Sequence, residues 1–229
     1  MAAPEPVSPA IGWGALHLFC KLTPNVDAEA VIAAVKAGQE DGHQVVSFAV
    51  LGHKADIGFL AVGPDLWHLR RLQAALQRAG LDLVDSYVSL TEMSEYAKDL
   101  PPEMATPRLH PQIPPEGMRA MCFYPMTKRR VADANWYATD FEERKRMMFE
   151  HGTSGRKFRG RILQLVTGST GVDDFEWGVT LFAHDPADLK EVVYTMRFDE
   201  ASARFGEFGT FITGLIDDIE VLLPTLVGG

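Results

Sequence analysis

Cysteine is scarce in this chain, and the two cysteines that occur are not arranged for cross-linking or for metal binding. The 229 residues include two cysteines, Cys20 and Cys122, and neither takes part in a CxxC or Cys/His spacing. This pattern disfavours a disulfide-bonded scaffold and a zinc module. It suits a reducing compartment, and we expect a cytoplasmic protein.

A basic leader and a long apolar run are missing as well. The first ten residues contain three prolines and no Lys or Arg, which is unlike a secretory signal. No apolar run reaches the roughly 18 residues needed to span a bilayer. We therefore expect residues 1–12 to form a disordered tail, and we expect no membrane partner.

An excess of positive charge is the third feature that the chain lacks. It has 22 Lys and Arg against 31 Asp and Glu, a net charge of −9. A surface that holds nucleic acid needs the opposite balance, so nucleic acid is not an expected partner. What the chain does have is 46% hydrophobic residues, enough to bury a substantial core in one domain or two moderate ones.

Residues 13–98 show alternating strand and helix signals. Asp27 is placed to cap the first predicted helix, and Pro64 and Gly80 bracket the second. The predicted strands are 15–22, 44–52, 56–63 and 81–96, and the predicted helices are 27–42 and 64–80. The order is therefore βαββαβ.

A second unit with the same order is predicted for residues 118–229. Its second helix has Asp185 as a cap and Pro186 at the first helical position. The predicted strands are 118–126, 160–169, 175–183 and 207–216, and the predicted helices are 140–152 and 185–206.

Residues 99–117 form a Pro-rich linker between the two units. Six prolines fall between positions 100 and 117, and we expect this stretch to sustain neither a helix nor a central strand. Both units have the ferredoxin-like order, in which helices cover one face of an antiparallel sheet. We therefore predict an α+β protein with two ferredoxin-like βαββαβ units in one chain, arranged as a dimeric α+β barrel.

Positive charge collects in one window of this acidic chain. Between Lys128 and Arg161 there are ten cations and five acids, a local excess of 10 − 5 = +5. One interpretation is an anion-binding patch. The other is a solvated helix face, because in residues 140–148 the acids lead and the cations follow, as the helix dipole favours.

His151 stands at the predicted end of the helix within that window, followed by a glycine. A histidine there can cap the last carbonyls of the helix. It can also be a metal or haem ligand, since a neutral imidazole is an ordinary ligand for iron. The position alone leaves both interpretations open.

Longer strings, taken together, resemble a known family. They are YPMTKRR at 124–130, NWY at 135–137, EHGTSGRKF at 150–158, TGSTGVDDFEWGVTLFA at 167–183 and VYTMRFDEASARFGEFGTF at 193–211. Their order and spacing resemble the chlorite dismutase-like haem proteins, and within them the coproheme decarboxylases of the non-actinobacterial type. The resemblance implies paired ferredoxin-like units, often as a homopentamer, with the porphyrin in the C-terminal unit.

The same resemblance assigns roles on the two sides of the iron. It makes His151 the proximal iron ligand, and it makes Gln164, thirteen positions further on, the distal residue. Chlorite dismutases have an arginine at that distal position, which suits an oxyanion, so a neutral amide disfavours chlorite chemistry. Glu200 is the nearest acid expected to orient His151.

Tyr124 and Lys128 are the catalytic residues that the resemblance implies. Tyr124 matches the tyrosine of the family's YPMSK segment, with Thr127 here in place of serine. A phenol can lose an electron and a proton and then take hydrogen from a propionate, while the Lys128 ammonium pairs with the propionate carboxylate. The pleat of a strand places Tyr124, Met126 and Lys128 on one face.

Further residues are expected to contact the porphyrin. The list comprises Met126, Trp136 and Trp177 as walls of the pocket, Arg156 and Ser202 as contacts to propionates, and Arg108 or His110 in the linker as an added cation. Each has a plainer alternative in the core or on the surface, such as packing for the tryptophans and a helix-end position for Ser202.

The activity implied is peroxide-dependent decarboxylation of two propionates of iron-coproporphyrin III, which gives haem b. Iron-coproporphyrin III is then both substrate and redox cofactor, and hydrogen peroxide is the oxidant. A transient contact with a ferrochelatase is a further expectation. The alternatives are a haem peroxidase or chlorite dismutase-like enzyme, and a non-catalytic porphyrin-binding or delivery protein.

Overall fold

The chain folds into two halves of like topology, which are seen in a computed structural model that describes residues 4–97 and 100–228. The N-terminal half comprises β1 (Gly14–Leu22), α1 (Ala28–Gly38), β2 (Gln44–Val50), β3 (Ile57–Gly63), α2 (Leu66–Arg78) and β4 (Leu81–Thr91). The connecting segment contains the 3-10 turn η1 (Glu95–Ala97) and α3 (Pro102–Leu109). The predicted boundary between the first unit and the linker, at 98–99, lies outside the described residues.

The C-terminal half has the same elements with several additions. It comprises β5 (Ala120–Lys128), β6 (Arg130–Val131), β7 (Ala134–Asn135), the 3-10 turn η2 (Trp136–Ala138), α4 (Phe141–Arg156), β8 (Ile162–Gly168), β9 (Trp177–Ala183), α5 (Pro186–Met196), α6 (Glu200–Phe205), β10 (Gly206–Phe208), β11 (Ile212–Ile216) and α7 (Ile219–Val227).

Both halves contain an antiparallel sheet with the ferredoxin-like strand order. The first sheet runs β2-β3-β1-β4, and the second runs β8-β9-β5-β11, with β10 beside the far end of β5. Within each half this is the order second, third, first and fourth strand. The predicted α+β class with two ferredoxin-like units is confirmed.

The two sheets join at their edges and close into a ring. One seam pairs β4 with β8 through Leu90↔Gly168 and Thr91↔Thr167, and the other pairs β11 with β2 from Gly214↔Val50 to Ile216↔Phe48. The pairing therefore runs from β5 through every strand back to β9, which pairs with β5 again. The seams are only two and three residue pairs long, so in the described part of the chain residues 81–89 of β4 have no strand partner on the edge toward β8.

The interior of this barrel is an apolar cluster built from both halves. Phe19 and Phe48 from the first sheet pack there with Phe123 and Phe182 from the second, and all four are at most 2% exposed. Full burial of each such side chain stabilises the fold by about 1.5–3 kcal/mol. The inner faces of the two sheets thus hold the halves together.

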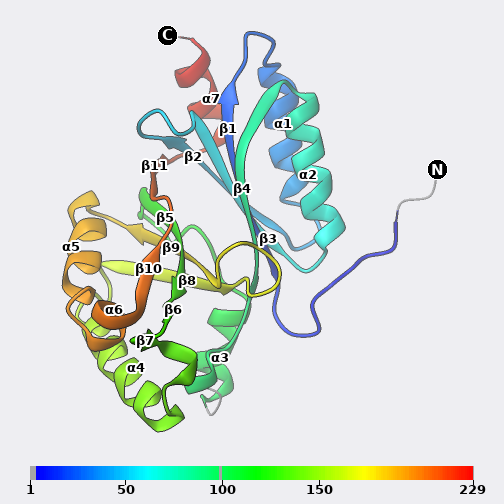
Figure 1. Ribbon diagram of the computed structural model, residues 1–229. Helices are drawn as coiled ribbons and strands as arrows, with labels where there is room; N and C mark the ends of the chain where they lie inside the picture. The colour runs from blue at the N-terminus through cyan, green and yellow to red at the C-terminus, as the bar shows by residue number, and fades with distance from the viewer. Residues whose placement is uncertain (1–3, 98–99, 229) are drawn as a thin grey trace.

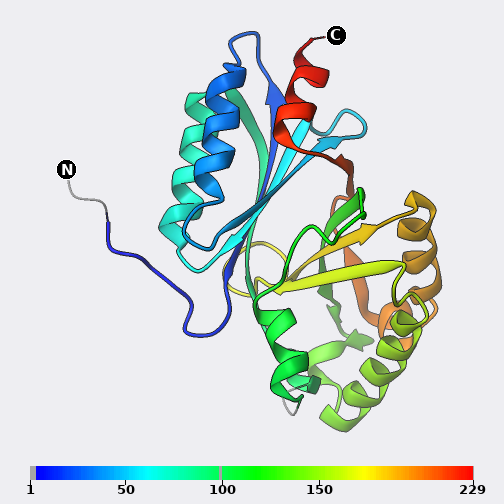
Figure 2. The ribbon, with the colours of Figure 1, turned by 180° about the vertical axis from the view of Figure 1, so that it is seen from behind.

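The helices cover the outer faces, on opposite sides of the molecule (Figures 1 and 2). Helices α1 and α2 pack on the first sheet through residues such as Val31 and Leu72. Helix α7, at the far end of the chain, joins the same cluster through Ile219 and Leu223. None of the helices in the described parts of the chain is long and apolar enough to cross a membrane.

Aspartate caps begin the main helices, as the sequence predicts. The Asp27 and Asp185 carboxylates accept hydrogen bonds from the backbone N–H groups of Ala30 and Ala187, at 3.0 and 2.8 Å. The prediction of a single helix over residues 185–206 is wrong, however. Helix α5 ends at Met196, and α6 begins at Glu200 after a break.

The expectation that the Pro-rich linker cannot form a helix is also wrong. Helix α3 spans Pro102–Leu109 in that segment and contains Pro107. Pro102 lies in the first turn, where its missing N–H has no intrahelical partner in any case. Because the helix has only two turns, Pro107 removes a single hydrogen bond near its end, and the helix stops soon after.

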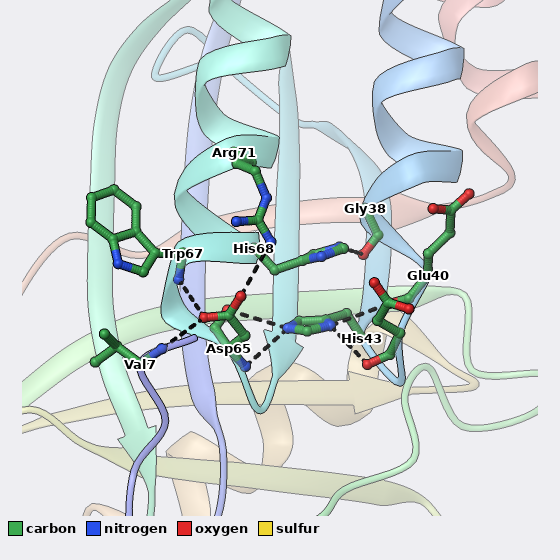
Figure 3. A network of polar contacts seen from close by, with 9 residues as sticks. Val7, Gly38, Glu40, His43, Asp65, Trp67, His68 and Arg71 are labelled. Atoms are coloured by element: carbon green, nitrogen blue, oxygen red, sulfur yellow. Dashed lines mark hydrogen bonds and ion pairs between the residues drawn. The ribbon is translucent and has the colours of Figure 1, made fainter. Parts of the chain in front are cut away.

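Residues 4–12 contain no helix or strand, yet they are attached to the first unit at one point. The Val7 N–H donates to Asp65 Oδ1 at 3.1 Å, and the Val7 carbonyl accepts from Leu66 N–H at 2.9 Å. Figure 3 shows the surrounding network, in which the Asp65 backbone N–H donates to His43 Nε2 at 3.1 Å and the His43 ring stacks on His68. This segment is therefore held against the start of α2.

His17 is a polar residue in the barrel interior. Its ring is 0% exposed, its Nε2 lies 2.8 Å from Thr180 Oγ1 across the two halves, and its Nδ1 has no hydrogen-bond partner in the described part of the chain. Burial lowers the pKa of His17 to about 3, because a charged imidazole is poorly solvated there. The folded protein therefore holds this ring neutral.

We expect His17 to make the fold sensitive to acid. Between pH of about 6.5 and about 3 the unfolded chain binds a proton at His17 and the folded chain does not, so the free energy of unfolding falls by about 1.4 kcal/mol per pH unit as the pH is lowered. Urea unfolding across this range measures the slope. His17→Gln should reduce the slope by one proton, whereas His53→Gln, a change at an exposed position, should not. Equal slopes for wild type and His17→Gln would contradict the assignment.

Candidate functional site

The outer face of the second sheet carries the residues predicted for catalysis. Tyr124, Met126 and Lys128 alternate along β5 on the face turned away from the barrel interior, while Phe123 points inward. Tyr124 is 6% exposed and stacks on Phe211, with ring centroids 4.4 Å apart. Burial raises the pKa of Tyr124 well above its usual value, so the phenol stays protonated at neutral pH.

The end of this face next to Tyr124 is apolar and only partly covered. Val166 of β8 lies across β9 from Tyr124 in the register of the sheet, and it is 40% exposed. Phe208 of β10, whose ring meets Tyr124 edge-on, is 42% exposed. Gln164, two residues before Val166 on the same face, is exposed as well. An uncovered apolar surface of this kind marks a binding site more often than a free surface.

The two halves differ in how their first helix is used. In the first half α1 packs on its sheet, but in the second half the described part of α4 contributes no residue to the cluster on the outer sheet face. Helix α4 is held instead through Met147, which packs with Trp136, Ala201 and Phe205. The apolar sheet face near Tyr124 therefore lacks the helix that covers its counterpart.

His151 lies inside α4. The interpretation of His151 as a C-terminal cap is wrong, because α4 continues to Arg156 and His151 is more than one turn from the end. Its side chain is 25% exposed. Burial and the nearby Lys128 ammonium lower the pKa of His151, while Asp199 opposes this shift. The imidazole is therefore neutral near pH 7, the form that binds iron.

Asp199, in the break between α5 and α6, is the acid next to His151. Its Oδ2 lies 3.2 Å from His151 Nδ1 without forming an aligned hydrogen bond, and its Oδ1 accepts from Ser154 Oγ at 2.6 Å. Ser202 Oγ is 3.4 Å from the same His151 nitrogen. Both contacts involve Nδ1, so Nε2 is the nitrogen that is free for a ligand.

The expectation that Glu200 orients His151 is wrong. Glu200 forms surface ion pairs with Arg146 and Arg204, both at 2.6 Å. Asp199 takes its place because α6 starts at Glu200, which turns the preceding residue toward α4. The sequence shows both acids side by side, and only the helix break distinguishes them.

Lys128 is a buried cation. It is 6% exposed, its Nζ donates to the Ala201 carbonyl at 3.0 Å, and it lies 4.9 Å from the centre of the Trp136 ring. Burial lowers the pKa of Lys128 to about 8, against the pull of Glu176. No carboxylate among the described residues forms an ion pair with Nζ. An ammonium held in this way is ready to receive an anion.

The remaining predicted residues are placed less centrally. Trp136 is 3% exposed and forms part of the wall behind Lys128, and Trp177 pairs with Met126 at the start of β9. Arg156 is exposed and donates to Thr153 Oγ1 at 2.6 Å. It lies about 140° around α4 from His151, so the structure does not bring it to the other site residues.

The linker residues are not brought to the site either. His110 packs its ring edge-on against Trp13, with centroids 5.0 Å apart. Arg108 donates to the Met104 carbonyl within α3. Neither has a contact with Tyr124, Lys128 or His151 in the described part of the chain.

The cationic window divides into paired and unpaired residues. Arg129, Arg130, Arg144, Arg146 and Arg161 each form an ion pair with a glutamate or an aspartate. For Arg146, whose side chain is 57% exposed, this agrees with the interpretation of a solvated helix face, but Arg144 is only 17% exposed and does not lie on such a face. Within the described residues, the other five cations have no such partner: Lys128, Lys145, Arg156, Lys157 and Arg159.

These features fit a flat, apolar, carboxylate-bearing macrocycle with a metal at its centre. The partly covered sheet face offers a surface for the ring, His151 offers a neutral imidazole nitrogen, and Lys128 offers a buried charge to a carboxylate. A separate cavity of about 600 Å³, between α1, β2, residues 113–119 and the start of α7, is lined by none of the predicted site residues. Its lining is mixed, with apolar residues such as Val46 and Ile113 beside the Lys36–Glu220 ion pair.

Comparison with known proteins shows strong likeness along the whole chain. The sequence pattern described as chlorite dismutase matches residues 25–216. A coproheme decarboxylase of Thermus thermophilus is 39% identical, with 96% of each chain covered. A coproheme decarboxylase of Staphylococcus carnosus is 38% identical, with 92% of this chain and 94% of the relative covered.

Solved structures show the same likeness. A heme-binding protein from Thermus thermophilus superposes with a TM-score of 0.83 at 37% identity, covering 99% of both chains. A chlorite dismutase from Candidatus Nitrospira defluvii superposes with a TM-score of 0.75 at 19% identity, covering 95% of this chain and 96% of that one. At this lower identity the likeness shows the fold.

We expect Asp199 to matter more for stability than its neighbour Glu200. Asp199→Ala should lower the free energy of unfolding by about 1–3 kcal/mol, because the buried Ser154 hydroxyl loses its acceptor and His151 loses the carboxylate next to its ring. Glu200→Ala, the matched control at an exposed ion pair, should lower the free energy of unfolding clearly less. Urea unfolding at pH 7 compares the two. A larger loss for Glu200→Ala would show that the wrong acid has been identified.

Proposed function

The chain belongs to the chlorite dismutase family, and on that premise we propose that it converts iron-coproporphyrin III to haem b by removing carbon dioxide from two propionates, with hydrogen peroxide as the oxidant. The relatives named coproheme decarboxylase support this activity. The single observation that carries the proposal is the buried Lys128 ammonium, which lacks a carboxylate partner in the described part of the chain and shares a strand face with Tyr124.

Binding is assigned to three parts of the site. His151 Nε2 would hold the iron, with Asp199 and Ser202 fixing the ring through Nδ1. The apolar face at Val166 and Phe208 would receive the ring of the macrocycle. Met126, Trp136 and Ser202 would border it, and Gln164 would stand on the opposite side from His151.

The reaction itself requires removal of hydrogen and electrons from each propionate. When bound, the iron supplies the one-electron chemistry by which peroxide acts as oxidant. Each propionate carboxylate loses carbon dioxide, one proton and two electrons to leave a vinyl group. One peroxide takes these two electrons, the released proton and a second proton from solvent to become two waters. The protein has to position the propionate and pass hydrogen from it.

Tyr124 is suited to pass that hydrogen, because its phenol is kept neutral by burial. A neutral phenol gives up its proton together with an electron, and the resulting radical takes a hydrogen atom from a carbon of the propionate. Lys128 would hold the carboxylate of the same propionate while this occurs. Its ammonium is mostly protonated at pH 7, since its pKa is about 8.

Assembly and location belong to the same proposal. We infer a homopentamer and a cytoplasmic location from the family, and a transient contact with a ferrochelatase that would supply the iron-coproporphyrin. Arg156, which stands apart from His151 in the single chain, would meet a propionate only at the rim of the site.

The decisive experiment mixes the purified apo-protein with iron-coproporphyrin III, follows the Soret band, and then adds peroxide and measures product mass. Formation of haem b with loss of two carbon dioxide molecules is the expected result. His151→Ala should weaken binding and change the spectrum. Binding without conversion would indicate a delivery protein, and peroxide consumption with an intact macrocycle would indicate a peroxidase. Either result would overturn the decarboxylase assignment.

We expect Tyr124→Phe to bind iron-coproporphyrin III almost as well as wild type but to form haem b about 100-fold more slowly or worse, because the ring packing remains and the transferable hydrogen is lost. Tyr194→Phe, a matched change at an exposed tyrosine, should convert at the wild-type rate. Stopped-flow spectra and product mass give both quantities. Normal turnover by Tyr124→Phe would remove this residue from the reaction.

A further inference from the structure

Glu176 is a buried carboxylate at the edge of the site that the proposed mechanism does not use. It is 6% exposed and directly precedes Trp177, the first residue of β9. Its backbone N–H donates to the Met126 carbonyl at 3.1 Å. The pairing of β9 with β5 thus brings this carboxylate to the end of the strand that bears Lys128.

Four donors from one stretch of chain meet this carboxylate. They are the Thr127 hydroxyl at 2.6 Å, the Lys128 backbone N–H at 3.1 Å, the Arg130 guanidinium and the Tyr137 hydroxyl. Although burial acts to raise it, these hydrogen bonds hold the pKa of Glu176 below its usual value. A buried carboxylate that is fully hydrogen-bonded in this way is a rigid structural anchor.

The anchor fixes both Lys128 and the ring that its ammonium faces. Glu176 holds the backbone of Lys128 directly. Through Tyr137 it also holds the turn that contains Trp136, and Trp136 lies 4.9 Å from the Lys128 ammonium. Residues 127–137 therefore form a loop whose two functional side chains depend on one carboxylate.

Glu176 also supplies a negative charge that acts on the Lys128 ammonium. The Lys128 ammonium has no ion pair in the described part of the chain, and the attraction of Glu176 is what opposes the effect of burial on it. Since the ammonium contacts a carbonyl and an aromatic face, its remaining capacity is available to an incoming anion.

We propose that Glu176 is a positioning residue that keeps Lys128 and Trp136 in the arrangement in which the ammonium receives a carboxylate of the substrate. This inference rests on the proposed function for the identity of that carboxylate. It rests on the geometry of the chain itself for the position of Lys128. The two parts can therefore be tested separately.

The first test uses the apo-protein and needs no porphyrin. NMR of ¹⁵N-labelled lysine side chains follows the titration of Lys128. The Lys128 signal is identified as the one that is absent from the spectrum of Lys128→Met. Glu176→Gln should lower the pKa of Lys128 below the wild-type value, because the charge that opposes burial is removed. Asp174→Asn, a change at an exposed acid in the same loop, should leave it unchanged. An unchanged Lys128 titration in Glu176→Gln would overturn the inference.

The second test uses binding. Glu176→Gln should bind iron-coproporphyrin III about tenfold more weakly, while its affinity for haem b, which lacks the two reactive carboxylates, should change less than about threefold. Adding Glu176→Gln to Lys128→Met should cause no further loss, because the two residues act as a unit. Equal weakening for both porphyrins, or additive losses, would assign Glu176 a merely structural role and would overturn the inference.

Thermal unfolding and circular dichroism show whether each variant is folded. If Glu176→Gln does not fold, Tyr137→Phe carries the test, because it removes one donor to the carboxylate without leaving a charge unpaired. It should shift both readouts in the same direction by a smaller amount, and no shift would count against the inference. Failure of the proposed function would show differently, as a wild-type protein that does not convert iron-coproporphyrin III.

Discussion

The inner faces of the two sheets bury each other, and the position of every other element follows from this contact. Because Phe19, Phe48, Phe123 and Phe182 must all be removed from water, the sheets close at two short seams and their outer faces point in opposite directions. Helices can then pack only on the outside, as Figures 1 and 2 show. A site on this scaffold has to form between an outer sheet face and a helix.

The two halves cover the outer faces of their sheets differently, and the candidate site lies where the second sheet is less covered. In the first half three helices, α1, α2 and α7, share one cluster over the sheet. In the second half α4 is fixed to α6 and η2 through Met147, so part of the apolar face stays accessible at Val166. The break between α5 and α6 serves the same end, because it turns Asp199 toward His151.

Patterns with a strong local cause could be read from the sequence. The strand order, the caps at Asp27 and Asp185, and the common face of Tyr124, Met126 and Lys128 follow from side-chain period and capping chemistry. The break at residues 197–199 and the acid that meets His151 could not be read, because long-range packing of α6 on α4 decides both. Resemblance to a family supplied the role proposed for His151, which its position on a helix leaves open.

The charge of Lys128 has no ion-pair partner in the described part of the chain, and an anionic ligand would balance it. A buried ammonium without a partner costs several kcal/mol, and Lys128 meets a carbonyl, an aromatic face and only the more distant charge of Glu176. An anion that binds beside the ammonium offsets this cost, and a propionate carboxylate would do so. On the proposed function, the loss of that carboxylate as carbon dioxide would leave the same charge unpaired again, and the product would be held less tightly than the substrate at this position. The geometry proposed to favour entry of iron-coproporphyrin would therefore also favour release of haem b.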